Sequence, residues 1–159
     1  MALSLCRVDD RLLHGQVVIG WGVPLQVRLV VLVDDAVRAN EWEQEIYRMA
    51  LPEGVAVEFA SVAEAVGQLR AWDSDPRRIF LLTGDVATMA ELVVRGEGVI
   101  RRVNLGGIHA GPGRRERARY IYLTEQEERM LQRLEAGGTI VTAQDLPTSP
   151  AITLSHLLA

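Results

Sequence analysis

Lysine is absent from this 159-residue chain, and its 17 strongly basic side chains are all arginines. This absence excludes every mechanism that needs a lysine amine. One such mechanism is nucleotide binding by a Walker A loop, in which a lysine reaches the phosphates. The glycine-rich stretch at 106–113 therefore does not form such a loop, and it also lacks the spacing of a dinucleotide-binding fingerprint.

Cysteine and long apolar runs are also scarce. Cys6 is the only cysteine, so the chain can form no internal disulfide, which suits a reducing cytosol. The longest apolar runs, such as Leu29–Val33 and Ile79–Leu82, are far too short to span a bilayer. The chain does not open with basic residues followed by an apolar stretch, which is the pattern of an export signal. We therefore expect a cytoplasmic protein.

The chain has fewer basic than acidic side chains, 17 against 21, so its formal net charge is -4 at pH 7. This balance argues against a nucleic-acid-binding protein, which would present a strongly basic face. The local exception is a cluster of four arginines, Arg114, Arg115, Arg117 and Arg119. This arginine cluster is either a solvated face or a surface that attracts an acidic partner or an approaching phosphate.

Apolar runs alternate with helical patterns along the whole chain. Short continuous apolar runs are typical of strands buried on both faces. Helix starts are marked by two capping boxes, Ser61 with Glu64 and Thr124 with Glu127. The alternation predicts a single α/β domain over residues 1–159, with a mostly parallel sheet covered on both faces. The predicted strands are 3–8, 29–33, 55–60, 79–83, 100–105, 120–123 and 139–143, and the predicted helices are 15–23, 41–51, 85–94 and those that the two capping boxes open.

The segment 9–17, Asp-Asp-Arg-Leu-Leu-His-Gly-Gln-Val, follows the first predicted strand and precedes the first predicted helix. In open α/β sheets, ligands bind in the crevice at the carboxyl ends of the strands. A helix that starts near Gly15 would direct unpaired amides and the positive end of its dipole into that crevice. Such a site suits a phosphoryl group.

His14 is the predicted nucleophile of this segment. Near pH 7 a histidine is largely neutral, and its ring nitrogen can attack phosphorus and later leave, so it can carry a phosphoryl group reversibly. Arg11 offers a planar guanidinium that matches phosphate oxygens, and Asp10 could orient Arg11 or the imidazole. Gly15 lets the backbone approach the phosphate closely. Gln16 completes the expected phosphate-binding set of this segment.

Two residues outside the segment have competing interpretations. Thr83 follows the fourth predicted strand and could donate its hydroxyl to the phosphate, but Thr83 or Asp85 could equally cap the next helix. His109 is a rival nucleophile, although no arginine precedes it at the spacing that separates Arg11 from His14. We interpret His109 as a loop residue near the site.

A receiver-type signalling domain is a second hypothesis, with Asp34-Asp35 as its acidic pocket. Receivers are doubly wound α/β domains, but they need a lysine after a late strand, and this chain has none. The acidic pair also follows the second predicted strand instead of the first. We therefore interpret Asp34-Asp35 as the end of a buried strand and predict no metal site.

The segment at 9–17 resembles the active-site segment of IIB subunits in the mannose/fructose/sorbose family of the sugar phosphotransferase system. That family segment reads Asp-Asp-Arg-Leu-Ile-His-Gly-Gln-Val, and only Leu13 departs from it. The likeness covers most of the chain in order, and it implies an α/β domain with a sheet of about seven strands. The further matching segments are Trp21, Val33-Asp34-Asp35, Leu51-Pro52-Glu53-Gly54-Val55 and Val103-Asn104-Leu105-Gly106-Gly107.

This resemblance implies that His14 accepts a phosphoryl group on its Nδ1 atom from the histidine of a IIA partner. His14 would then pass the group to a sugar bound by the membrane subunits IIC and IID. The resemblance also implies a cytoplasmic phosphotransferase that associates with the inner face of the membrane through IIC and IID and needs no cofactor. The alternative is a regulatory phosphohistidine protein without a dedicated transporter, and the two readings remain open at the level of the sequence.

Overall fold

The computed structural model describes residues 3–159 and is built on a seven-stranded sheet with the order β3-β2-β4-β1-β5-β8-β9. All neighbouring strands in it are parallel except β8 and β9. The prediction of a mostly parallel, seven-stranded sheet is confirmed. The strands are β1 (Leu3–Asp9), β2 (Leu29–Val33), β3 (Ala56–Ala60), β4 (Ile79–Thr83), β5 (Arg102–Gly107), β8 (Ile140–Ala143) and β9 (Ile152–Thr153), and a separate hairpin pairs β6 (Arg115–Ala118) with β7 (Ile121–Leu123).

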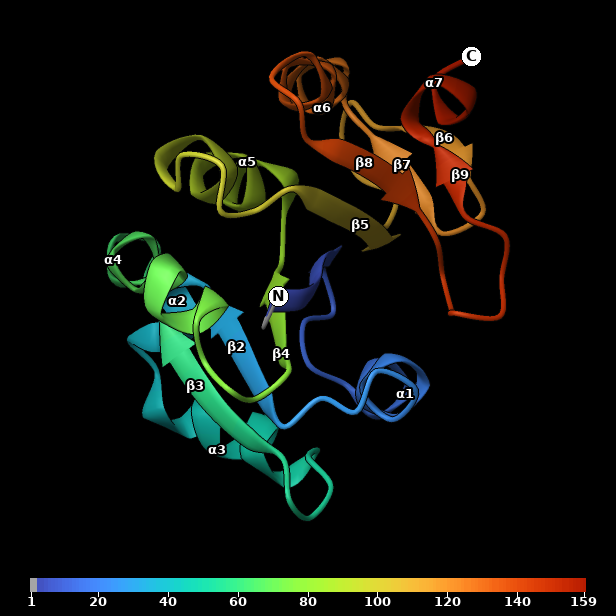
Figure 1. Cartoon of the computed structure of the whole chain (residues 1–159). Helices are drawn as coiled ribbons and strands as arrows, with labels where there is room; N and C mark the ends of the chain where they lie inside the picture. The colour runs from blue at the N-terminus through green and yellow to red at the C-terminus, as the bar shows by residue number, and fades with distance from the viewer. Residues whose placement is uncertain (1–2) are drawn as a thin grey trace.

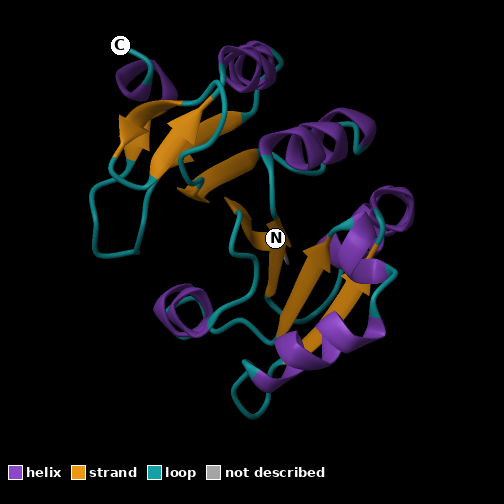
Figure 2. Cartoon of the chain, turned by 180° about the vertical axis from the view of Figure 1, so that it is seen from behind, coloured by secondary structure: helices purple, strands orange, loops and turns teal. Residues whose placement is uncertain are grey.

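Helices cover both faces of the sheet, so the molecule has the three layers expected of the α/β fold (Figures 1 and 2). Both predicted capping boxes are present, at the starts of α4 and α6. No helix formed by residues 3–159 combines the length and apolar character needed to cross a membrane. On one face lie α4 (Val62–Asp73), α5 (Val86–Arg95) and α6 (Glu125–Ala136), on the other lie α1 (Gly15–Val17), its π-helical continuation η1 (Val18–Gly22) and α3 (Glu41–Met49), and the short helices α2 (Asp35–Arg38) and α7 (Leu154–Leu157) complete the set.

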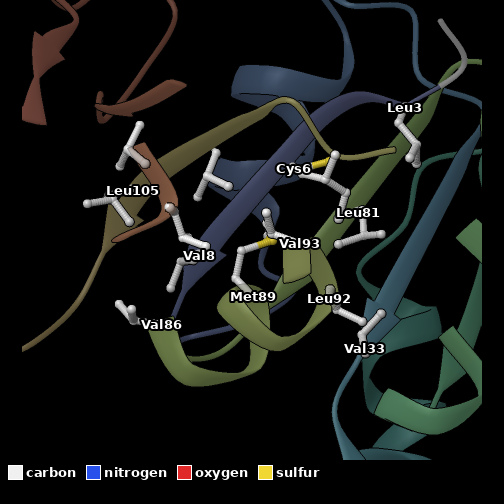
Figure 3. Close-up of a cluster of buried hydrophobic side chains, with 14 of the residues drawn as sticks. Leu3, Cys6, Val8, Val33, Leu81, Val86, Met89, Leu92, Val93 and Leu105 are labelled. Carbon is white, nitrogen blue, oxygen red and sulfur yellow. The ribbon is translucent and has the colours of Figure 1, made fainter. Parts of the chain in front are cut away.

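Strand β2 shows why the sheet is covered on both faces. All five of its residues are buried, and successive side chains of a strand point to opposite faces. Val31 belongs to the larger apolar core, with side chains of α4, α5 and α6, whereas Leu32 belongs to the smaller core with side chains of α1 and η1. Figure 3 shows part of the larger core, where Met89 of α5 lies near Val8 of β1 and Leu92 of α5 lies near Val33 of β2.

Four short elements are absent from the sequence prediction: α2, β6, β9 and α7. Strand β6 reads Arg-Glu-Arg-Ala and has no apolar alternation, so it carries no signal of a half-buried strand. Its arginines contact α6 through ion pairs instead of apolar packing. Two arginines of the cluster, Arg115 and Arg117, therefore belong to a hairpin strand that is ion-paired with α6, so the cluster is not simply a solvated face.

Candidate functional site

Strand β1 lies where the order of the sheet reverses. The chain places β2, β3 and β4 on one side of β1, and then places β5 and β8 on its other side. In open α/β sheets such a reversal opens a crevice at the carboxyl ends of the strands, where ligands bind. The loop that follows β1 contains His14, so the predicted nucleophile lies at this crevice.

His14 is held by Asp9, the last residue of β1. The His14 Nε2 atom lies 3.3 Å from Asp9 Oδ2. The Asp9 side chain is 0% exposed, whereas the His14 side chain is 20% exposed. Because an ionised carboxylate can only accept a hydrogen bond, His14 carries its proton on Nε2 and keeps a lone pair on Nδ1. The pair therefore selects the ring nitrogen that remains free to react.

The charge state of His14 also suits a nucleophile. Burial is the main reason that the pKa of His14 lies below its ordinary value, and Arg11 and Arg7 lower this pKa further. The Asp9 carboxylate opposes the shift through its charge and its hydrogen bond. The imidazole is therefore neutral near pH 7, which is the form that attacks phosphorus.

The charge of Asp9 is balanced by a fully buried arginine within β1. Arg7 Nη2 lies 3.4 Å from Asp9 Oδ2, and Arg7 Nη1 donates to Asn104 Oδ1 at 2.6 Å and to the Gln144 carbonyl at 2.9 Å. Its guanidinium lies against the backbone of Gly106, where an added Cβ would come within 1.8 Å of Arg7 Cζ. Sequence reasoning missed these roles of Arg7, Asp9 and Gly106. A charged residue inside an otherwise apolar strand was the available signal.

The loop between β1 and α1 turns sharply and leaves open space beside His14. Leu12 adopts a left-handed backbone conformation with φ 58, which is costly for a residue with a side chain. A Cβ on Gly84 would come within 3.0 Å of the Leu12 side chain, so a glycine there makes room for this turn. The first turn of α1 receives no side-chain cap, and a Cβ on Gly15 would meet no atom within 4 Å. The backbone next to His14 is therefore accessible to a ligand.

Arg11 and Gln16, which flank His14 in the sequence, line a cleft of about 270 Å³. The guanidinium of Arg11 is 47% exposed, and its Nε atom lies 3.8 Å from Asp9 Oδ1. Arg11 therefore connects the buried carboxylate with the open cleft. The remaining lining residues come from the end of β5, the hairpin and the loop after β8, and are Gly106, Gly107, Ile108, His109, Arg119, Tyr120, Tyr122 and Asp145.

Asp10 contacts the rival histidine and not His14. Its Oδ1 atom lies 2.6 Å from His109 Nδ1, and its Oδ2 atom accepts a hydrogen bond from the His109 amide at 2.8 Å. The orienting role that the sequence suggested for Asp10 is filled by Asp9, which also accepts a hydrogen bond from the Arg11 amide at 3.1 Å. His109 itself is 64% exposed and lies at the cleft, as expected of a loop residue near the site.

Thr83 is not brought to the surface of the cleft. It is 0% exposed, and its hydroxyl donates to the Asp85 carbonyl at 3.3 Å. Asp85 is the residue that caps α5. The acidic pair after β2 is likewise used for capping, because Asp34 accepts from the Val37 amide at 2.9 Å and Asp35 accepts from the Val62 amide at 2.8 Å. These contacts agree with the interpretation of the pair as the end of a buried strand.

Comparisons with known sequences agree with the family resemblance of the segment at 9–17. The family model described as "PTS system sorbose subfamily IIB component" matches residues 3–159. The N-acetylgalactosamine-specific phosphotransferase enzyme IIB component 2 of Escherichia coli (strain K12) is 29% identical over 156 residues, which are 98% of this chain and 98% of that protein. The mannose-specific EIIAB component of the same strain is 26% identical over 159 residues, which are 100% of this chain and 49% of that protein.

A solved structure extends the likeness to three dimensions. The crystal structure of the N-acetylgalactosamine-specific IIB component 1 from Escherichia coli matches with a TM-score of 0.88 and 26% identity, covering 95% of this chain and 98% of that one. The match includes the helix-covered, mostly parallel sheet on which the site is built. The family match, which spans almost the whole sequence, and the shared fold together show that this chain belongs to the sorbose subfamily of IIB components of the sugar phosphotransferase system.

Proposed function

We propose that this IIB component carries a phosphoryl group on His14 Nδ1, receiving it from a IIA partner and passing it to a sugar bound by the IIC and IID subunits. The main observation in support of this proposal is the contact of His14 Nε2 with buried Asp9, which leaves Nδ1 free in a partly exposed ring. Arg11 lies 3.8 Å from the other oxygen of the Asp9 carboxylate, and the open backbone at Gly15 follows His14 directly in the chain. The partners and the cytoplasmic side of the membrane are proposed from the family resemblance, and one relative is named an EIIAB component.

In the first transfer, the lone pair on His14 Nδ1 attacks phosphorus. The bond between phosphorus and the donor nitrogen breaks, and its electron pair stays with the donor histidine. The proton on Nε2 remains hydrogen-bonded to Asp9, whose charge stabilises the positive charge that develops on the ring. Arg11 supplies a guanidinium that matches the phosphoryl oxygens.

In the second transfer, a hydroxyl oxygen of the sugar attacks phosphorus. The bond between His14 Nδ1 and phosphorus breaks, its electron pair returns to Nδ1, and the hydroxyl proton passes to solvent. His14 is thereby restored to its neutral form, with the same Nε2–H contact to Asp9. A carrier must be able to run this exchange repeatedly, and a nitrogen that is both a nucleophile and a leaving group allows it.

Labelling with a phosphorylated IIA donor tests the assignment of His14. We expect one acid-labile, base-stable phosphoryl group per wild-type chain, none on His14→Ala and full labelling of His109→Ala. His109→Ala is the matched control because it removes the histidine that lines the cleft beside Arg11 and Gln16. Label that survives in His14→Ala would show that another residue carries the phosphoryl group.

The destination of the group needs a separate measurement. Labelled protein is mixed with membranes that contain IIC and IID and with a panel of sugars, and sugar phosphate is quantified. Sugar phosphate together with loss of label supports the transport role. Label that stays on the protein with every sugar would contradict transfer to a sugar and favour the regulatory alternative.

A further inference from the structure

Three members of the arginine cluster form ion pairs with helix α6. Arg117 donates two hydrogen bonds to the Glu128 carboxylate, at 2.7 and 2.9 Å, and Arg115 lies 3.5 Å from the same group. Arg114 pairs with Glu127 at 3.3 Å. These contacts hold the hairpin on the helix, so the three guanidinium groups already have anionic partners.

Arg119, the fourth member, is placed differently. In β6, Arg115 and Arg117 are two residues apart and both point toward α6. The pairing of β6 with β7 shifts register between Glu116 and Ala118, and β6 ends at Ala118, so Arg119 does not continue this pattern. The turn that contains Arg119 is attached to the end of β5, because the Ile108 amide donates to the Tyr120 carbonyl at 2.9 Å. Arg119 thereby lines the same cleft as Arg11, and it forms no ion pair with any residue in the described range 3–159.

The charge of a phosphoryl group explains why a second cation is needed. A phosphate ester or its analogue carries about two negative charges near pH 7. Arg11 brings one positive charge, part of which is already balanced by Asp9 at 3.8 Å. We propose that Arg119 is a second phosphate-binding arginine, which together with Arg11 holds the phosphoryl group that His14 carries. This inference rests on the proposed function and adds a binding residue from a distant segment.

Asp145 is a negatively charged residue of the same cleft, so its substitution should change phosphate affinity in the direction opposite to that of Arg119. It lines the cleft and forms no ion pair with Arg119 within 4.0 Å in the described part of the chain. Its backbone carbonyl accepts hydrogen bonds from Arg7 at 3.2 Å and from Trp21 at 2.9 Å, and these contacts do not depend on its carboxylate. A carboxylate beside a bound phosphate repels it, so removing this charge should strengthen the binding of an anion.

Titration with inorganic phosphate at low ionic strength, followed by ³¹P NMR or calorimetry, measures the predicted site directly. We expect saturable binding to the wild-type protein and a Kd about tenfold higher for Arg119→Ser, the effect of one lost charge-assisted hydrogen bond. Arg119→Lys should recover part of the affinity, because it keeps the charge but loses the planar fork. Asp145→Asn should lower the Kd by about twofold to threefold.

Arg115→Ser is the matched control, since it removes an arginine of the same cluster that faces Glu128. Its Kd for phosphate should change by less than about twofold. Absence of saturable phosphate binding, equal weakening by Arg115→Ser and Arg119→Ser, or no change in Arg119→Ser would each overturn the inference. Labelling of His14 by the donor is scored separately on the same preparations. Full labelling with an unchanged Kd in Arg119→Ser would therefore reject Arg119 while the carrier function stands.

Discussion

Asp9 and Asp10, adjacent residues at the end of β1, each contact a histidine. The two aspartate–histidine pairs differ in burial, in distance and in the ring nitrogen that is contacted. Asp9 and His14 form a pair whose carboxylate is 0% exposed and whose imidazole is 20% exposed. Asp10 and His109 form a shorter contact, 2.6 Å against 3.3 Å, but the second imidazole is 64% exposed. The shorter contact therefore belongs to the pair that water screens more strongly.

Burial, and not residue type or distance, distinguishes His14, the proposed phosphoryl carrier, from the surface residue His109. In the buried pair, Asp9 is also bound to Arg7 and to the Arg11 amide, so it can hold the His14 ring in one orientation. The contacts differ at the ring as well, because Asp9 faces Nε2 of His14 whereas Asp10 faces Nδ1 of His109. Only the first pair leaves Nδ1 free, the atom that the family resemblance assigns to phosphate.

Asp9→Asn should have a larger effect than Gly106→Ala or Asp10→Asn, which likewise leave both histidines in place. The substitution keeps the size of the side chain but removes the charge that holds the Nε2 proton of His14 and balances Arg7. We expect the labelling rate of His14 to fall by at least about 100-fold, as expected when an imidazole loses its orienting carboxylate. We also expect the free energy of unfolding to drop by about 3–5 kcal/mol, because the buried Arg7 guanidinium loses the carboxylate that it contacts. Rapid-quench labelling and urea denaturation measure the two losses, and a rate within tenfold of wild type would contradict the orienting role.

Gly106→Ala tests whether the buried pair depends on the position of Arg7. A Cβ at residue 106 would come within 1.8 Å of Arg7 Cζ, so the guanidinium must leave the position in which it contacts Asp9 and Asn104. We expect a loss of about 3 kcal/mol in the free energy of unfolding, the upper end of ordinary overpacking, and slower labelling of His14. Gly67→Ala is the control, since a Cβ there meets no atom within 4 Å and α4 should gain stability by up to about 1 kcal/mol. Urea denaturation of the two variants should therefore move in opposite directions.

The pH dependence of the buried pair follows from the lowered pKa of His14. An ordinary histidine is half protonated at about pH 6.5, but His14 should still be mostly neutral there. Because the unfolded chain binds this proton at higher pH than the folded chain, the contribution of His14 to stability is present above pH 6.5, the ordinary value, and is lost as pH falls toward the lowered pKa. The NMR shift of the His14 ring protons gives the pKa, and the difference in unfolding between wild type and His14→Gln gives the linkage. An unchanged or raised pKa would contradict the account of burial given above.

Much of the fold follows from local patterns in the sequence. Strands β2 and β4 are continuous apolar runs, and capping boxes mark the starts of α4 and α6. Strand β6 could not be found in this way, because its side chains are charged and are satisfied by Glu128 on a helix that comes later in the chain. The short strand β9 likewise exists only through its antiparallel pairing with β8. Elements defined by long-range contacts leave little trace in local periodicity.

The positions of several predicted site residues also follow from local sequence. His14, Arg11, Gly15 and Gln16 lie in one short segment, and the structure brings this segment to the crevice at the end of β1. The assignment of the orienting carboxylate needed tertiary information. Whether Asp9 or Asp10 points toward His14 depends on which of them is buried, and Asp10 is diverted by His109, which is 99 residues away. Residue spacing alone does not distinguish two adjacent carboxylates.

Asp10→Asn should have the smallest effect, and it completes the comparison. Asp10 is 24% exposed and its partner His109 is 64% exposed, so water and salt already screen the pair. The amide that replaces the carboxylate can still accept the hydrogen bond of the His109 amide, now 2.8 Å from Oδ2. We expect the free energy of unfolding to change by less than about 1 kcal/mol and the labelling rate of His14 to change by less than about threefold. A loss as large as that of Asp9→Asn would show that the exposed pair also acts on His14, and the distinction by burial would then fail.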